Sequence, residues 1–316
     1  MNLIFDGSLD KLAFRAVFGE NMEALAAADS NVVYLDADMM SSIDTRNFWK
    51  RNPQQAINCG IAEANMMGVA AGLSAGGKKP YVHTFGPFAS RRVYDQVVLS
   101  IAYAGLSVRI FGTDPGVAAA FNGGTHMPFE DLALYRAIPR ATVIEISDST
   151  MLKNIMWQIK EREGLTYVRM TRKNYHGIYG EGNDFKIGKG LVLREGGDAA
   201  VIACGMMVSE AMLAAEILAG EGIHIKVIDM FTIKPLDVDL VREAAKTGLI
   251  VTAENHNIVG GLGEAVATAL IEANAAPGFR RIGMRESFGE VGPVDYLQEK
   301  FGLNAENIAK TIREAL

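Results

Sequence analysis

Short runs of apolar, β-branched residues alternate with helical patterns along almost the whole chain. Strand-like runs include "NVVYLDA" (31–37), "KPYVHTF" (79–85) and "DAAVIAC" (198–204), and the stretches 61–75 and 208–220 carry apolar residues at helical spacing. Strands that are apolar along their length and alternate with helices are typical of parallel sheets covered by helices on both faces. The sequence therefore predicts an α/β fold.

The alternation is interrupted at "HGIYGEGNDFKIGKG" (176–190), which is rich in glycine and has no sustained period. A chain of 316 residues has room for two domains of ordinary size. We therefore expect two domains, 1–175 and 191–316, joined by 176–190, each a mainly parallel sheet with helices on both faces. The expected strands are 31–37, 79–85, 106–112, 141–147, 165–170, 198–204, 223–229, 248–254 and 278–284, and the expected helices are 10–28, 61–75, 89–104, 149–163, 208–220, 237–247, 261–274 and 305–315.

Composition and charge narrow the class of protein. The net charge is −6 and no basic run occurs, which argues against nucleic acid as a partner. No apolar run reaches the length of a membrane span, and the N-terminus lacks the basic lead and apolar core of a signal peptide. Cys59 and Cys204 stand among apolar residues and are expected to be reduced core thiols. These features predict a cytoplasmic protein.

Glu63 stands at the head of an apolar helical stripe formed by Met66, Met67, Ala70 and Leu73. A buried carboxylate is costly unless another group pairs with it. One interpretation is a capping box with Gly60 as the N-cap, in which Glu63 bonds back to the backbone. The alternative is that Glu63 belongs to a functional site.

Polar and aromatic side chains gather after the strands of the first domain. In open α/β sheets this is the edge at which ligands bind. The residues concerned are Asp36, Asp38, Ser41, Ser42, His83, Phe85, Phe88, Arg91, Arg92, Asp114, Asn122, Thr125, His126, Asp131, Arg169 and Arg172. Asp38 and Ser42 could instead cap helices, Phe85 and Phe88 could belong to the core, and at least one of Arg91 and Arg92 could be a solvated charge. Together the residues indicate an α/β enzyme with a polar cleft.

Several motifs in fixed order resemble the C-terminal half of transketolase. They are "GIAEAN", "TFGPF", "RRVYDQV", "GGTHMPFED", "RAIPRATVIE", "YVRMTR" and "VTAENHNIVGGLGEAVA". The resemblance spans nearly the whole chain and implies a thiamine diphosphate pyrimidine-binding domain over 1–175 and a transketolase C-terminal domain over 191–316. It is strongest to the small subunit of a split transketolase, which implies transfer of a two-carbon ketol unit from a ketose or ketose phosphate donor to an aldose acceptor.

The resemblance also implies roles for residues that would face the cofactor, thiamine diphosphate. Glu63 matches the catalytic glutamate that bonds the pyrimidine N1′ and shares a proton with it. Phe85 and Phe88 match aromatics that pack on the pyrimidine ring, and Asp38 matches the acid of the cofactor loop. We expect Arg91 to contribute to the cofactor site as well.

Other residues match family positions that bind the sugar. Arg15, Ser42 and Arg172 match residues that bind the sugar phosphate, where a guanidinium offers a fork of donors. His126 matches the catalytic histidine that contacts the C1 hydroxyl and carbonyl of the donor. His256, in the C-terminal signature, is expected to be structural.

Two positions of the expected substrate site depart from the family pattern. Asp114 stands where the family usually has a histidine that contacts phosphate, and a carboxylate there would repel a phosphate dianion. Asn122 stands where an aspartate commonly selects hydroxyl stereochemistry. A non-phosphorylated or modified acceptor therefore remains an alternative.

The chain lacks the GDG motif with a downstream asparagine through which thiamine enzymes bind the metal of the diphosphate. The resemblance therefore implies that no metal ligand comes from this chain. A larger N-terminal subunit would supply the ligands of Mg²⁺ or Ca²⁺ in an α2β2 assembly.

Three other interpretations stay open. One is the β subunit of a 2-oxoacid dehydrogenase E1, and another is a relative of deoxyxylulose-phosphate synthase. "TFGPFASRRVYDQ" and "GGTHMPFED" favour transketolase over the first of these. The third is a non-catalytic scaffold, against which the retention of Glu63, Phe85, His126 and Arg172 argues. The sequence identifies neither the donor and acceptor nor the pathway.

Overall fold

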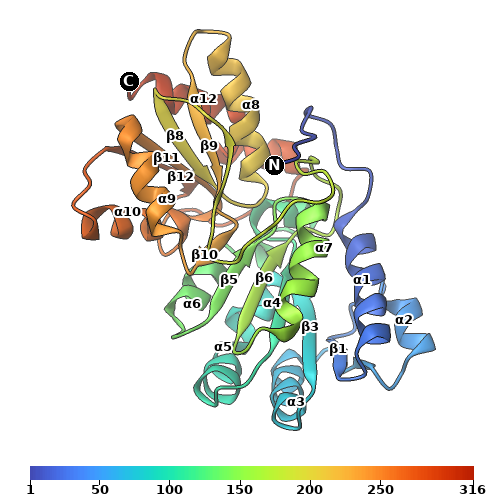
Figure 1. Ribbon diagram of the computed structural model, residues 1–316. Helices are drawn as coiled ribbons and strands as arrows, with labels where there is room; N and C mark the ends of the chain where they lie inside the picture. Colours follow the sequence, from blue (N-terminus) through green and yellow to red (C-terminus); the bar gives the residue numbers. More distant parts are fainter.

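The computed structural model describes all 316 residues and contains two sheets (Figure 1). The first sheet has seven strands in the order β10-β5-β6-β4-β3-β1-β2. Its strands are β1 (Val32–Asp36), β2 (Ala56–Asn58), β3 (Lys79–Phe85), β4 (Arg109–Thr113), β5 (Thr142–Glu145), β6 (Thr166–Met170) and β10 (Thr232–Lys234). All neighbours are parallel except β10 and β5.

The second sheet has five strands in the order β12-β11-β8-β9-β7. Its strands are β7 (Leu191–Arg194), β8 (Ala199–Ala203), β9 (Ile225–Asp229), β11 (Leu249–Asn257) and β12 (Gly278–Met284). Only β7 and β9 pair antiparallel. The expectation of two mainly parallel sheets is confirmed.

Helices cover both faces of each sheet. Successive side chains of a strand point to opposite sides, so strands that are apolar along their length need cover on both faces. The longer helices are α1 (Phe14–Ala28), α3 (Glu63–Ala75), α7 (Ser149–Gln158), α8 (Met207–Ala219), α10 (Leu262–Glu272) and α12 (Ala305–Arg313). The shorter ones are α2 (Arg46–Arg51), α4 (Gly86–Ala89), α5 (Tyr94–Gln96), α6 (Asp131–Ala137), α9 (Val238–Ala244) and α11 (Val294–Phe301). No helix is both long enough and apolar enough to cross a membrane.

Two hydrophobic clusters lie on the opposite faces of the sheets. On one face of the first sheet, Tyr34 and Phe111 pack with α1 and α7, which lie side by side in Figure 1. On the other face, Val82 and Ile110 pack with Met66 of α3. Each cluster continues onto the second sheet, so one continuous core on each face joins the two sheets.

β10 was not expected, although it links the two parts of the chain. Its three residues are too few to show a period, and they follow 176–190 in the sequence but pair with β5 of the first sheet. Lys234 also donates from Nζ to the carbonyls of Arg136 and Ile138. The chain beyond residue 190 therefore contributes to both sheets. The strands β2 and β7 and the helices α2, α6 and α11 were also not expected.

The capping-box interpretation of Glu63 is wrong. The helix α3 begins at Glu63 itself, with Ala62 as its N-cap and no side-chain cap, so Glu63 stands at the first helical position and cannot complete a capping box with Gly60. The expectation for the cysteines is confirmed for Cys204, a free thiol fully buried in a hydrophobic cluster, whose Sγ also donates to Oε2 of Glu145 at 3.1 Å, whereas Cys59 is a free thiol that is only partly buried.

Candidate active site

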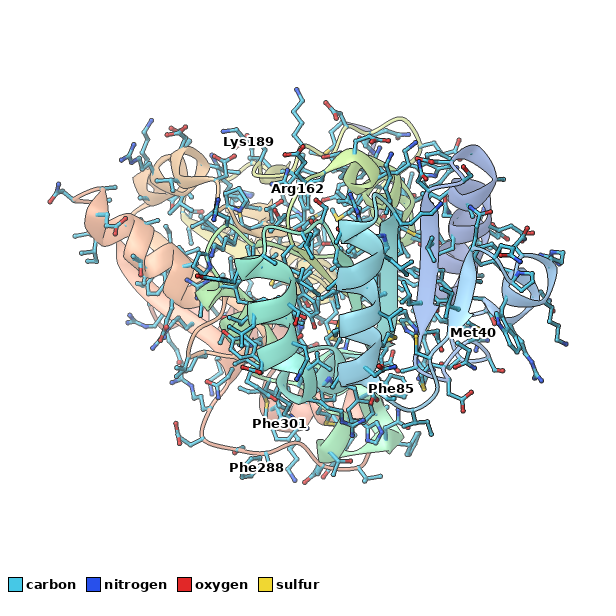
Figure 2. All side chains as sticks on the ribbon, turned by 90° about the horizontal axis from the view of Figure 1, so that it is seen from below. Met40, Phe85, Arg162, Lys189, Phe288 and Phe301 are labelled. Atoms are coloured by element: carbon cyan, nitrogen blue, oxygen red, sulfur yellow. The ribbon has the colours of Figure 1, made fainter.

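The candidate site lies where the carboxyl ends of the central strands of the first sheet meet. Asp38 follows β1, Phe85 ends β3, Asp114 follows β4 and Arg172 follows β6. In Figure 2, Phe85 lies toward the lower end of the first sheet and Arg162 toward its upper end. The parallel topology thus gathers residues that are far apart in the sequence.

Three aromatic rings form one wall of the site. The ring centroids of Phe85 and Phe88 are 6.2 Å apart, and that of His126 lies 5.6 Å from Phe85 and 5.2 Å from Phe88. All three pairs meet edge to face, the arrangement that aromatic quadrupoles prefer. This aromatic wall of Phe85, Phe88 and His126 offers flat apolar surface for a planar ligand.

Glu63 lies beside the aromatic wall. Its side chain is 5% exposed, and Oε1 accepts a hydrogen bond from Nη1 of Arg92 at 2.6 Å. The guanidinium carbon of Arg92 lies 3.7 Å from the centroid of the Phe88 ring. Oε2 of Glu63 accepts no hydrogen bond from another side chain or from the backbone of this chain, and it is not fully buried. Glu63 therefore has one oxygen paired and one available, at a helix N-terminus that favours a negative charge.

Arg91 and Arg92 have different environments. Arg91, 44% exposed, pairs with Glu130 and donates from Nη2 to the carbonyl of Thr125 at 3.0 Å. Arg92 contacts Glu63 and Phe88 directly, although the sequence singled out Arg91 for the cofactor site. The sequence gives no reason to distinguish these adjacent arginines. Both lie in a short 3₁₀ turn, Arg91–Val93, which directs their side chains to different partners.

His126 is held next to this pair of arginines. Its Nδ1 lies 2.9 Å from Oγ1 of Thr125. Burial lowers the pKa of His126, and the positive charges of Arg92 and Arg91 lower it further. The imidazole is therefore neutral at pH 7, with one nitrogen that can donate and one that can accept.

Arg172 is fixed by Asp114. The Asp114 carboxylate accepts from the Arg172 backbone N–H at 3.0 Å and from Nε at 2.8 Å, and also from Nη2. Arg172 Nη1 donates to the carbonyl of Ser42 at 3.4 Å, and the Arg15 backbone N–H donates to the carbonyl of Arg172 at 3.0 Å. The guanidinium carbon lies 4.5 Å from the centroid of Phe85. The structure thus brings Arg15, Ser42 and Arg172 together beside the aromatic wall.

Asp38 and Asn122 lie at the margin of this group. Asp38 is exposed, adopts a φ of 64° and accepts from Nδ2 of Asn58 at 3.1 Å. Asn58 Oδ1 in turn accepts from the backbone of Gly60, in the turn that leads to Glu63. Asn122 is exposed and ends a 3₁₀ segment four residues before His126.

Asp36 and His83, two of the polar residues noted after the strands, lie in the core beneath the site. His83 Nδ1 is 3.0 Å from Oδ2 of Asp36, and its Nε2 is 3.1 Å from Oγ1 of Thr113. The Tyr34 hydroxyl donates to the same Asp36 oxygen at 2.6 Å. These fully buried groups join β1, β3 and β4 and support the cleft without lining it.

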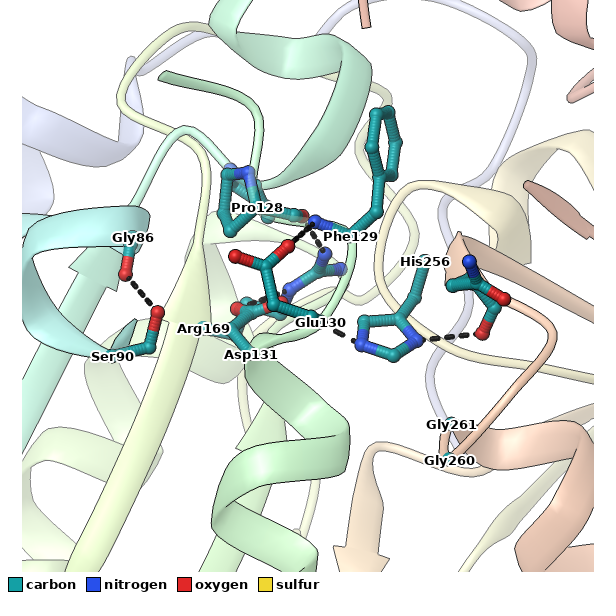
Figure 3. A network of polar contacts seen from close by, with 12 residues as sticks. Gly86, Ser90, Pro128, Phe129, Glu130, Asp131, Arg169, His256, Gly260 and Gly261 are labelled. Atoms are coloured by element: carbon teal, nitrogen blue, oxygen red, sulfur yellow. Dashed lines mark hydrogen bonds and ion pairs between the residues drawn. The ribbon is translucent and has the colours of Figure 1, made fainter. Parts of the chain in front are cut away.

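A second buried cluster connects the site to the second sheet. It contains Asp131 and Arg169, which the sequence placed at the cleft and which the structure buries completely. Arg169, fully buried, donates to Asp131 at 2.9 Å, to Glu145 at 2.6 Å and to the carbonyl of Asn255 at 2.8 Å. Figure 3 shows the Pro128–Glu130 segment between Arg169 and His256. This arginine cluster anchors the segment that follows His126.

His256 contributes to this region without facing the cleft. It is fully buried, and its Nδ1 lies 2.7 Å from the carbonyl of Asn257. Burial and the nearby Arg169 charge lower the pKa of His256 to about 4, so the ring is neutral. The backbone of Asn257 donates to the carbonyl of Phe129 at 3.0 Å. The end of β11 therefore helps to hold the loop that carries His126.

Comparison with known proteins assigns the family. Residues 10–177 match the transketolase pyrimidine binding domain, and residues 188–308 match the transketolase C-terminal domain. Over 315 residues the chain is 48% identical to the 6-deoxy-6-sulfo-D-fructose transketolase subunit of Clostridium sp., covering 99% of this chain and 98% of that protein. Over 306 residues it is 34% identical to one of the subunits of the apulose-4-phosphate transketolase of Phocaeicola vulgatus, covering 96% of this chain and 97% of that protein.

A solved structure shows the same fold over almost its whole length. It is described as a split gene transketolase, inactive beta4 tetramer, and it superposes with a TM-score of 0.89 at 38% identity, covering 96% of this chain and 98% of that one. These matches support the transketolase interpretation over the 2-oxoacid dehydrogenase alternative. The chain belongs to the transketolase family and has the extent of the separate C-terminal subunit of a split transketolase.

Proposed function

We propose that this chain is the C-terminal subunit of a thiamine diphosphate-dependent split transketolase, which transfers a two-carbon ketol unit from a ketose donor to an aldose acceptor. One observation carries the proposal. Glu63, buried beside Phe88 and held by Arg92, keeps one carboxylate oxygen without a hydrogen-bond partner. A largely buried acid whose second oxygen opens toward an aromatic wall suits a planar nitrogen base as its ligand.

The residues present fit an aminopyrimidine. The planar guanidinium of Arg92 already stacks on Phe88 and donates an N–H to Glu63, which are the two contacts that such a ring would also make. Bound thiamine diphosphate supplies an electron sink for cleavage of the bond between C2 and C3 of the ketose. Asp38, in the loop next to Asn58, and Arg91, beside Thr125, are proposed to complete the cofactor site.

The residues of this chain would control a proton and exclude water. Glu63 would hold the proton at N1′ through its free Oε2, and the apolar rings of Phe85 and Phe88 would keep water from that proton. His126, neutral and next to both rings, would hydrogen-bond the C1 hydroxyl and the carbonyl of the donor.

The other end of the substrate would meet Arg15, Ser42 and Arg172. Two relatives are named after sugars that carry an anionic group. One sugar is a sulfo-sugar and the other is a sugar phosphate. A guanidinium with remaining N–H donors suits a tetrahedral anion of either kind. Asp114 would act on the substrate through Arg172, and Asn122 would lie near the sugar hydroxyls.

A partner chain would complete the cofactor site. We propose an N-terminal subunit with the GDG motif that binds the diphosphate and supplies the ligands of Mg²⁺ or Ca²⁺, in an α2β2 assembly in the cytoplasm. Two facts support this proposal: this sequence contains no GDG, and the similar solved structure is a split gene transketolase described as an inactive beta4 tetramer.

Reconstitution tests the proposed function. The chain, the N-terminal subunit and their mixture are each assayed with thiamine diphosphate, Mg²⁺, a ketose and an aldose. We expect ketol transfer only in the mixture, and a loss of about 10²- to 10⁴-fold with Glu63→Gln. Glu272→Gln, at an exposed carboxylate on α10, is the control and should keep full activity.

Three outcomes would overturn the proposal. The first is full ketol transfer by this chain alone. The second is turnover of the mixture only with pyruvate and a lipoyl domain, the reaction of the 2-oxoacid dehydrogenase alternative. The third is unchanged activity of the mixture with Glu63→Gln, which would indicate a scaffold without catalytic residues.

A further inference from the structure

The corner of the site that would hold the anionic end of the sugar contains as much negative as positive charge. Arg172 is paired with Asp114 through a carboxylate oxygen 2.8 Å from Nε, and Arg15 Nε lies 3.3 Å from Oδ2 of Asp44. Two guanidinium charges therefore face two carboxylate charges. This balance differs from a phosphate site in which arginines act without counter-charges.

On the basis of the proposed function, we propose that this corner selects a ketose whose tail carries a single negative charge, such as a sulfonate, over a phosphate dianion, and that Asp114 sets this preference. A sulfonate and a phosphate ester both offer three tetrahedral oxygens. They differ in charge, because a phosphate ester carries about −1.5 to −2 at pH 7 and its second pKa is about 6.

Asp114 is a fixed part of the corner. Its side chain is 2% exposed, and its backbone has a φ of 54°, with its N–H bonded to the carbonyl of Met170 at 3.0 Å. Both carboxylate oxygens accept hydrogen bonds from Arg172. An arriving anion therefore meets the Arg172 charge together with the buried charge of Asp114.

Arg172 still has donors for a tetrahedral group. A guanidinium has five N–H bonds, of which Nε and one on Nη2 go to Asp114 and one on Nη1 goes to the carbonyl of Ser42. One N–H remains on each Nη atom. The corner can therefore recognise the shape of the anion while its net charge favours one negative charge over two.

The other cationic residues at the aromatic wall add no unpaired positive charge to this corner. His126 packs against the ring of Phe85, and burial with the Arg92 and Arg91 charges lowers its pKa, so it is neutral above pH 7. Arg91 and Arg92 are each paired with a carboxylate, Glu130 and Glu63. The second charge of a phosphate dianion would therefore have no unpaired counter-charge from His126, Arg91 or Arg92.

Donor competition in the reconstituted enzyme tests the inference. The donors are 6-deoxy-6-sulfofructose, fructose 6-phosphate and uncharged fructose, with the uncharged acceptor glycolaldehyde, from pH 5.5 to 8. At pH 8 we expect kcat/KM for the sulfonate to exceed that for the phosphate at least tenfold. The preference should shrink as the pH falls through about 6, because the phosphate ester then becomes a monoanion.

A substitution separates the charge of Asp114 from its hydrogen bonds. Asp114→Asn keeps a carbonyl oxygen for Arg172 and removes the negative charge, so the phosphate-to-sulfonate ratio of kcat/KM at pH 8 should rise about tenfold. The ratio compares two donors on the same protein, so partial loss of folded enzyme does not alter it.

The outcomes are distinguishable. A preference for the phosphate at pH 8, or equal use of charged and uncharged donors, would overturn the inference and leave the proposed function intact. A ratio unchanged by Asp114→Asn would remove Asp114 as its cause. Absence of ketol transfer from all three donors would overturn the proposed function together with the inference.

Discussion

Replacing Arg169 with methionine should strongly destabilise the chain. The guanidinium is fully buried and pairs with Asp131 at 2.9 Å and Glu145 at 2.6 Å, and both partners are buried as well. Methionine keeps most of the aliphatic length and removes the charge, which leaves two buried carboxylates without their cation. The carbonyls of Asn255 and Pro128 also lose a donor.

The size of the effect follows from these lost partners. Removing one partner of a buried ion pair costs about 3–5 kcal/mol, because the remaining charge stays desolvated. Each buried carbonyl left without its donor adds about 1 kcal/mol or more. We therefore expect the free energy of unfolding to fall by about 5 kcal/mol, a large share of the roughly 5–15 kcal/mol typical of folded proteins.

Urea unfolding, followed by circular dichroism, measures this change. Arg194→Met is the matched control, because Arg194 pairs with an exposed glutamate, Glu216, and such surface pairs contribute about 1 kcal/mol or less. The loss in Arg169→Met should be smaller at pH 5 than at pH 8, because unpaired buried carboxyls can then take up protons. A change below about 1 kcal/mol at pH 8 would mean that Asp131 and Glu145 do not depend on Arg169 for their charge balance, since an unpaired buried charge costs several times that.

Two further predictions concern Asp229 and Arg92. Burial raises the pKa of Asp229 to about 7, while the unfolded value is about 3.9. Because the folded state binds this proton more tightly, stability should fall as the pH rises from about 4 and level off above about 7. Asp229→Asn should therefore show a smaller drop in melting temperature from pH 5 to 8 than the unsubstituted chain. An equal drop would contradict a raised pKa of Asp229 as the cause of this pH dependence. Arg92→Met removes the hydrogen bond to Glu63 and the stacking on Phe88, so kcat of the reconstituted enzyme should fall about tenfold, roughly 1.4 kcal/mol. Arg280→Met, at an arginine whose side chain bonds only the carbonyl of its neighbour Phe279, should leave kcat unchanged, and an equal loss in both variants would exclude a specific role for Arg92.

The sequence predicted those parts of the fold that depend on local pattern. The run "KPYVHTF" over 79–85 coincides with β3, and the apolar helical stripe after Glu63 coincides with the buried face of α3. β10 could not be predicted in this way, because its three residues are placed by antiparallel pairing with β5, some 90 positions earlier in the chain.

For the candidate site, the sequence predicted which residues would follow the carboxyl ends of the strands. Arg15, Ser42 and Arg172 do come together, and so do Phe85, Phe88 and His126.

The sequence could not predict in which direction individual side chains of the site point. The 3₁₀ turn at Arg91–Val93 points Arg92, not Arg91, at Glu63, and the left-handed backbone at Asp114 turns its carboxylate onto Arg172. Both depend on backbone angles that residue identity does not fix.

Whether Glu63 activates the cofactor can be measured by exchange of the C2 proton of thiamine diphosphate for deuterium, followed by NMR in the assembled pair of subunits. We predict rapid exchange in the assembled enzyme and an exchange rate lower by about 10² or more with Glu63→Gln, while Glu272→Gln exchanges at the full rate. Exchange that is equally fast with Glu63→Gln would contradict the proposal that this chain activates the cofactor through Glu63.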